Sequence, residues 1–110
     1  QRADKKAMND LQTLAKDTRT LYGAEAKYLV AQQLYKAGEY TAAEKEILNF
    51  IDQSTPHAYW LARSFVLLSD VYVAMDKKLD ARQYLLSLQQ NYHADDDIEQ
   101  MINERLEKLK

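Results

Sequence analysis

The 110-residue sequence has no cysteine, one proline, two glycines and no long hydrophobic run. The absence of cysteine excludes disulfides, thiolate metal sites and a cysteine nucleophile, and it suits a reducing or an oxidising compartment equally. Gly23 and Gly38 lie too far apart to form a glycine-rich phosphate loop. No segment approaches the roughly 20 apolar residues that cross a bilayer, and Gln1 begins no recognisable signal peptide. We therefore expect no direct membrane insertion.

An excess of positive charge is also missing. The chain has 15 lysines and arginines against 17 aspartates and glutamates, which gives a formal charge of -2. Such a chain has no surplus cations to displace the counterions of a phosphate backbone, so we expect no nucleic-acid partner. Hydrophobic residues make up 46% of the sequence and charged residues 29%. This balance predicts one folded domain, residues 1–110, and not a disordered chain.

A pattern of small and large apolar residues occurs three times along the sequence. Ala7, Ala43 and Ala81 begin the three copies, so the period is 36 residues and then 38 residues. Large apolar residues follow each alanine four and seven positions later, which places all three side chains on one face of a helix. Periods of this length are typical of stacked helical hairpins. The large residues are Leu11 and Leu14, Ile47 and Phe50, and Leu85 and Leu88.

Turn and capping signals divide these segments into pairs of helices. Between the helices of the first pair, Gly38 predicts a left-handed residue at a helix end. Residues Asp76, Lys77 and Lys78 are a weaker equivalent between the helices of the second pair. Thr55 as N-cap and Pro56 at the first helical position predict a long helix from Pro56 to about Met75. Acidic residues 95–97 predict the start of a closing helix. No alternating pattern indicates strands, so the predicted fold class is all-α.

The segment from Ala24 to Ala43 resembles a tetratricopeptide repeat (TPR), and a second, similar copy follows it. The resemblance covers nearly the whole chain. Two departures are visible: Lys27 stands where the first copy would have tryptophan, and the interval between copies exceeds the regular repeat length. The matching positions are Val30, Ala31, Leu34, Ala43, Ile47 and Phe50 in the first copy, and Phe65, Leu68, Ser69, Tyr72 and Ala81 in the second.

The resemblance implies antiparallel helical hairpins stacked as a short right-handed solenoid. Residues 1–17 correspond to the second helix of a truncated repeat, and residues 95–109 to a C-terminal capping helix. Between them, residues 20–54 form one repeat and residues 56–92 form a repeat with a long first helix. The chain looks like the C-terminal end of a long bacterial TPR protein, and proteins of that kind are often exported, which implies the periplasm or cell envelope. Self-association through an exposed N-terminal helix is a further expectation.

In the resembled family, one side of the first helices lines a concave groove that binds a partner. Asp70 occupies a position where some members place an asparagine that grips a chaperone C-terminus, and its charge is expected to repel a peptide carboxylate. The alternative for Tyr28 and Tyr35 is that they pack against the preceding helix. The groove residues implied by the resemblance are Tyr28, Gln32, Tyr35 and Lys36 in the first copy, and Val66, Asp70 and Val73 in the second.

We find no pattern that predicts an enzyme, a cofactor or a metal site. The serines have no neighbouring histidine and aspartate, and Ser69 stands where the repeat needs a small residue. Pairs of acids such as Glu44 and Glu46, or Glu39 and Glu25, occur at exposed helical positions. Lysines such as Lys45 and Lys27 are their ordinary ion-pair partners. The acids at 95–97 are explained by helix capping, and His57 is expected to face solvent.

Three hypotheses for function follow from the sequence. The first is a non-catalytic scaffold that binds a protein or peptide partner in the groove. The second is a structural C-terminal cap of a longer solenoid, without a binding site of its own. The third is a carrier or hydrolase site at residues 95–97, which requires a bound metal ion.

Overall fold

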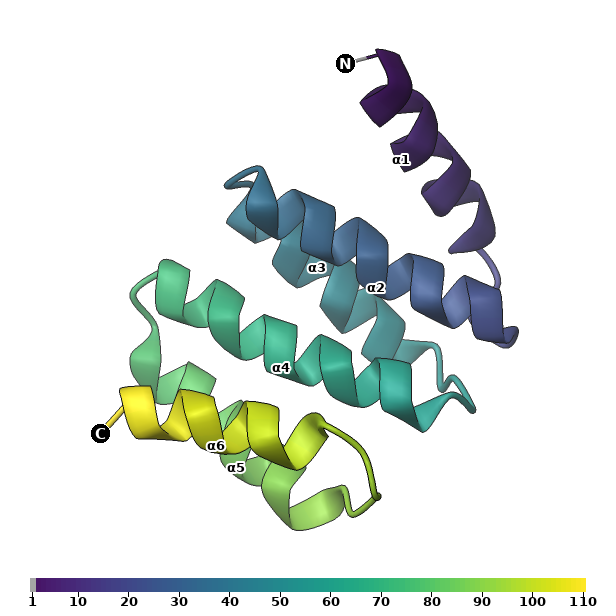
Figure 1. Ribbon diagram of the computed structural model, residues 1–110. Helices are drawn as coiled ribbons and strands as arrows, with labels where there is room; N and C mark the ends of the chain where they lie inside the picture. Colours follow the sequence, from purple (N-terminus) through teal and green to yellow (C-terminus); the bar gives the residue numbers. More distant parts are fainter. Residues whose placement is uncertain (1) are drawn as a thin grey trace.

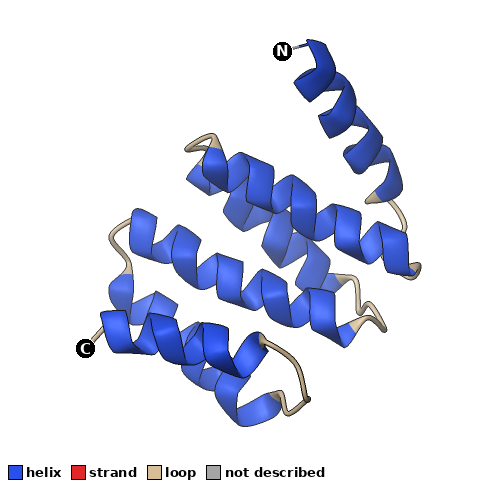
Figure 2. Cartoon of the chain, in the orientation of Figure 1, coloured by secondary structure: helices blue, strands red, loops and turns tan. Residues whose placement is uncertain are grey.

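The computed structural model describes residues 2–110 and, within them, the side chains from Lys6 onward. The described chain is helical with no strand, so the all-α prediction is confirmed (Figure 2). All six predicted helices are present, although the range 1–17 begins at Gln1, which lies outside the described residues. The helices are α1 (Arg2–Leu14), α2 (Leu21–Lys36), α3 (Tyr40–Asp52), α4 (Ala58–Ala74), α5 (Lys78–Asn91) and α6 (Ile98–Lys108).

The helices form two layers. Figure 1 shows α2, α4 and α6 side by side and running in the same direction, with α3 and α5 behind them. Each of α3 and α5 packs against the helix that precedes it, and α4 also contacts α2, α3 and α6. Helix α1 contacts α2 alone among the described helices. Helix α4 is therefore the centre of the molecule.

Two helix ends match the turn signals in the sequence. Gly38 has φ 79° and Asp76 has φ 61°, so both residues are left-handed as predicted. In each turn the two N–H groups after the helix bond back to its last-turn carbonyls: Glu39 N–H donates to Leu34 and Lys77 N–H to Tyr72, at 2.9 and 2.7 Å. This is the Schellman pattern, which satisfies carbonyls that the helix leaves unpaired. The chain reverses at these points, so each helix meets its successor antiparallel.

The predicted start of α4 is wrong by two residues. The helix begins at Ala58, and His57 is the N-cap residue, without a side-chain capping bond. Thr55 Oγ1 instead donates to the carbonyl of Thr18 at 2.6 Å and accepts a bond from the His57 N–H. Because the Thr55 hydroxyl joins the loop before α4 to the loop before α2, it does not cap the helix. Helix α4 runs from Ala58 to Ala74, which is shorter than the expected range from Pro56 to about Met75, and with 17 residues it is one residue longer than α2.

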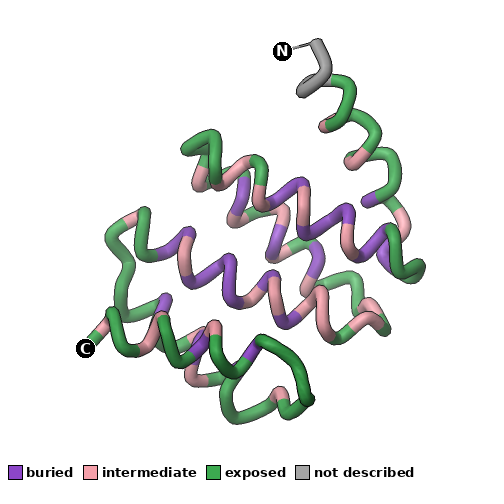
Figure 3. The backbone as a smooth tube through the Cα atoms, viewed as in Figure 1, coloured by how far each residue is buried: buried purple, intermediate pink, exposed green. Residues whose placement is uncertain are grey.

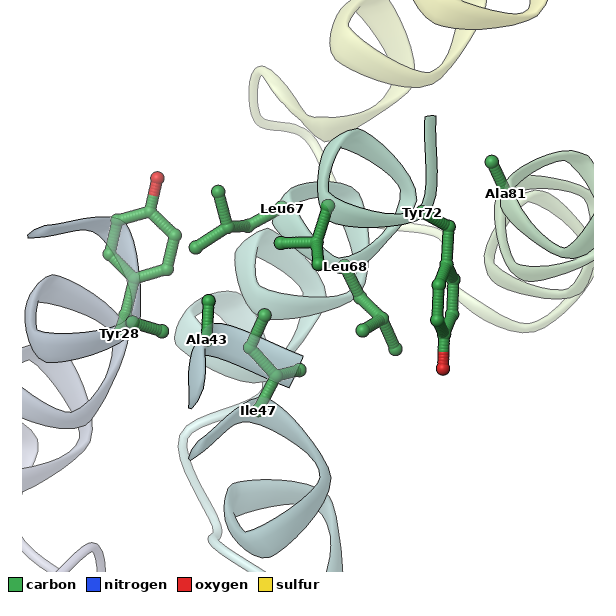
Figure 4. Packing of buried hydrophobic residues seen from close by; sticks show 9 residues of the cluster. Tyr28, Ala43, Ile47, Leu67, Leu68, Tyr72 and Ala81 are labelled. Carbon is green, nitrogen blue, oxygen red and sulfur yellow. The ribbon is translucent and has the colours of Figure 1, made fainter. Parts of the chain in front are cut away.

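The main core lies between the two layers. Figure 4 shows side chains of α2, α3, α4 and α5 meeting around Leu67 and Leu68 of α4. Figure 3 shows buried positions concentrated on α2 and α4, whereas α1 and α6 are mostly exposed. A second cluster joins α4 and α5 to α6 through Ile98 and Ile102. Because each helix pair buries its apolar face on its neighbours, no pair has a complete core of its own.

The face that α1 turns toward the core differs from the predicted stripe. Met8, Leu11 and Ala15 pack against Ala26 and Val30 of α2. Ala7 is exposed and Leu14 is 51% exposed, so of the predicted residues only Leu11 takes part in this contact. The physical reason is that α2 is the only described helix beside α1, and it covers only one side of it. Among the described residues, no helix has both the length and the apolar character needed to cross a membrane.

Candidate binding groove

A groove runs along α4 between α2 and α6. Helices α2 and α6 both contact α4 but do not contact each other, so α4 forms the floor. A smaller hollow of about 170 Å³ lies on the α2 side, and a wider one of about 570 Å³ lies toward the C-terminal ends of the three helices. Both hollows are lined by Tyr35, Asp70 and Arg105, so we treat them as one groove. Its other polar and charged lining residues include Gln32, Lys36, Arg63, Lys78, Glu104 and Lys108.

All seven residues assigned to a groove by the family resemblance line this one. Six of them line the smaller hollow or both hollows, and Val73 lines the wider one. Their accessibility differs widely. Tyr28 and Val66 are only 6% and 3% exposed, whereas Val73 is 40% exposed. A ligand in the groove therefore meets the half-buried Gln32, Tyr35 and Asp70 and the exposed Lys36 and Val73 before it meets the other two.

Tyr28 is a packing residue as well as a lining residue. Its ring lies 5.6 Å from that of Trp60 on α4, and it belongs to the main core. The alternative interpretation placed it against the preceding helix, but its ring partner Trp60 belongs to α4, two helices later. The Tyr28 hydroxyl accepts hydrogen bonds from Gln32 at 3.3 Å and from Arg63 at 3.2 Å. Tyr28 therefore orients two polar side chains of the groove.

Tyr35 lies at the junction of the two hollows. Its ring packs on Tyr40 with centroids 5.7 Å apart, and burial, followed by the nearby Asp70 carboxylate, raises the pKa of its phenol. The phenol is thus neutral at physiological pH. A neutral phenol supplies a hydrogen-bond donor and a large rigid ring, a combination that suits recognition of a partner.

Arg63 is a groove residue that the sequence did not indicate. Its guanidinium lies 4.9 Å from the ring centre of Tyr28 and 5.7 Å from that of Trp60. The Nε atom is buried without a hydrogen-bond partner, and no ion pair among the described residues includes Arg63. The available signal was the placement of Arg63 four residues after Tyr59 and three after Trp60, which stacks cation and rings on one helical face. Arg63 is half-buried, and because no acid among the described residues pairs with it, its positive charge can attract an anion to the groove.

Asp70 does not act as the free negative charge that we expected. Arg105 of α6 donates two hydrogen bonds to its carboxylate, at 2.8 and 3.0 Å. This two-bond geometry is the strong form of an arginine–carboxylate pair. The expected repulsion of a peptide carboxylate by Asp70 is therefore offset by Arg105. The sequence could not reveal this because the two residues are 35 positions apart.

The groove is cationic although the chain as a whole is acidic. Five cationic side chains line it, against the two acids Asp70 and Glu104, so its formal charge is +3. The whole chain has a formal charge of -2, so the remainder carries -5. Positive charge is thus concentrated where the concave surface lies. The five cationic residues are Lys36, Arg63, Lys78, Arg105 and Lys108.

The acidic run at residues 95–97 is engaged in holding its loop. Asp96 accepts a hydrogen bond from the Ile98 N–H at 2.9 Å and another from the Tyr92 hydroxyl. Asp97 accepts one from Tyr59 at 2.9 Å. Burial and these carboxylates raise the pKa of Tyr59, and that of Tyr92 to about 12. Among the described residues, no group of three or more histidine, cysteine or acidic side chains is placed to hold a metal ion.

Two other polar residues differ from expectation. His57 is half-buried, and its Nε2 lies 2.9 Å from the carbonyl of Arg19, so it bridges two loops and does not face solvent. Lys27 was expected at an exposed position, but it is buried, where it forms an ion pair with Glu46 at 2.7 Å and also donates to Asn49. Lys27 thus forms a polar link between α2 and α3.

The comparisons with known proteins add no relative. No protein-family model matches the chain, and neither the curated proteins nor the solved structures include a match.

Proposed function

We propose that this chain is a non-catalytic scaffold that binds a protein or peptide segment in the groove between α2, α4 and α6. The observation that carries the proposal is the meeting of all seven family-implied residues along one concave surface. That surface combines a half-buried tyrosine, an exposed valine and an arginine that belongs to no ion pair among the described residues. Rigid aromatic rings and arginines are the side chains that dominate binding energy at protein interfaces.

We further propose that the helices form a TPR-like right-handed solenoid. The pairs α2 with α3 and α4 with α5 are antiparallel hairpins, and each pair ends its first helix in the same Schellman turn. Helix α6 covers the apolar side of the second pair through Ile98 and Ile102, as a capping helix does. The repeat period in the sequence supports the same arrangement.

The second candidate function is a structural cap at the end of a longer solenoid. The observation in its favour is the open side of α1. A hollow of about 440 Å³ lies between α1 and α2, lined by Met8, Leu11 and Leu34 among others, and Leu14 on the same helix is half exposed. This surface also makes α1 the element through which the chain is proposed to self-associate.

Selection of peptides from a random display library tests the scaffold function. We expect selected peptides to bind the native chain and to lose binding to Val73→Trp, because the larger side chain fills the wider hollow from an exposed position. Leu79→Trp is the matched control, since Leu79 is 82% exposed and does not line the groove. Peptides that bind both variants as well as they bind the native chain would contradict the proposal.

Sedimentation equilibrium of Leu14→Glu against native protein tests self-association through α1.

A further inference from the structure

We propose that the groove takes an acidic, extended peptide segment, whose side-chain carboxylates face the cations of α2, α4, α5 and α6. This inference rests on the proposed function and names the chemistry of the partner. The electrostatic basis is the formal charge of +3 in the groove of a chain whose other residues sum to -5. Complementary charge of this kind steers a partner to its site and rejects partners of the wrong sign.

Helix dipoles account for only part of this charge. Lys36 and Lys108 lie in the last turns of α2 and α6, where a cation stabilises the helix by interacting with its negative end. Lys78 is different, because it is the first residue of α5 and lies at the positive end of that helix. Arg63 lies in the middle of α4, away from both ends. Local helix stability therefore does not explain Lys78 or Arg63.

The three lysines gather at one end of the groove. Helices α2, α4 and α6 run in the same direction, so the C-terminal ends of α2 and α6 and the α4–α5 turn lie together (Figure 1). Arg63 lies further along the floor, on the α2 side. From Arg63 to Ala74 the helix rises roughly 16 Å. An extended segment of about five residues spans that length.

The groove also offers apolar side chains that a peptide can contact. Val73 and Leu109 line the wider hollow with Lys78 and Lys108, and Met101 lines the smaller one with Arg63. Alternate side chains of an extended chain point to opposite sides, so acids and apolar residues in alternation can meet the walls and the floor together. The carboxylates come from side chains, and a free C-terminus is not required.

The probe is a fluorescent peptide of about eight residues that alternates glutamate and leucine, acetylated at its N-terminus and amidated at its C-terminus. Its binding to the native chain is measured by fluorescence anisotropy at about 50 mM and about 500 mM NaCl. We expect binding at low salt and a loss of roughly tenfold in affinity at high salt. A peptide with glutamine in place of each glutamate is expected not to bind. Equal affinity of the two peptides would overturn the inference.

Charge-reversal variants locate the site. The double variant Lys78→Glu, Lys108→Glu changes two exposed side chains, and we expect it to weaken binding by roughly tenfold or more. The double variant Lys16→Glu, Lys45→Glu is the matched control, because both lysines are exposed and lie outside the groove. Asp70→Asn is expected to act in the opposite direction and tighten binding, since it frees the Arg105 charge. Equal losses in the groove variant and the control would overturn the assignment.

The outcomes separate this inference from the proposed function. If the display library yields groove-dependent peptides without acidic residues, the scaffold function stands and the inference fails. If no selected peptide depends on Val73, both fail. A requirement for a free C-terminal carboxylate, or equal competition by a single-stranded oligonucleotide of matched charge, would also overturn the inference.

Discussion

At the scale of the residue, Gly23 is the position where the first turn of α2 comes closest to the backbone of the preceding loop. A Cβ atom at this position would lie 1.8 Å from the carbonyl oxygen of Asp17 and 2.7 Å from Thr20 Oγ1. Thr20 is the N-cap of α2 and accepts a hydrogen bond from the Gly23 N–H at 2.9 Å. The absence of a side chain at Gly23 therefore lets the α1–α2 turn close onto the first turn of α2.

We expect Gly23→Ala to destabilise the chain by about 2 kcal/mol, because the clash with backbone atoms outweighs the roughly 1 kcal/mol by which alanine favours a helix over glycine. Urea unfolding followed by circular dichroism measures the change. Gln33→Ala, at an exposed position of the same helix, is the control and should shift stability by less than about 0.5 kcal/mol. A stabilised Gly23→Ala variant would show that the close contact does not exist.

At the scale of the element, the two hairpin turns use one geometry with different residues. Gly38 and Asp76 are both left-handed, and both follow a helix whose last carbonyls they help to satisfy. Glycine adopts this conformation without a steric penalty, whereas a residue with a Cβ atom loses roughly 1 kcal/mol. The second turn is therefore the less stable of the two.

We expect Asp76→Gly to stabilise the chain by about 0.5 kcal/mol and Gly38→Ala to destabilise it by about 1 kcal/mol. A Cβ atom at Gly38 meets nothing within 4 Å, so its cost comes from the backbone conformation alone. Shifts of the urea midpoint in opposite directions, with an unchanged slope, check both values. Gly38→Asn should lose less than Gly38→Ala, because asparagine tolerates the left-handed conformation better. The same loss in both variants would argue against this account.

At the scale of the whole molecule, the Asp70–Arg105 pair holds α6 on α4 across 35 positions of sequence. Both side chains are about three-quarters buried, with 24% and 28% exposed. The two bonds join the groove floor to one of its walls. The Lys110–Glu107 pair offers a contrast, since its side chains are more than 70% exposed and both belong to the C-terminal end.

A double-mutant cycle on alanine variants of Asp70 and Arg105 should give a coupling energy of about 1 to 2 kcal/mol, because the pair is partly buried and forms two bonds. The same cycle on Glu107 and Lys110 should give less than about 0.5 kcal/mol, since solvent screens exposed pairs. Urea unfolding provides the free energies. Equal coupling in the two cycles would mean that Asp70 and Arg105 do not hold α6 in place.

The sequence by itself determined the all-α class, the six helices and the two left-handed turns, because helical periodicity and turn conformation depend on residues a few positions apart. It also placed Ser69 correctly as a buried small residue. The seven groove positions came from family resemblance, and the structure brings them onto one surface.

Only the tertiary structure decided which side chains from distant parts of the sequence contact one another. It paired Asp70 with Arg105, placed Arg63 against Tyr28, turned Met8 of α1 toward α2 and drew the Thr55 hydroxyl to the Thr18 carbonyl. Each of these contacts joins different helices or loops. Local spacing contains no information about which neighbour a helix face will meet, so the cationic character of the groove became visible only when α2, α4 and α6 were set side by side.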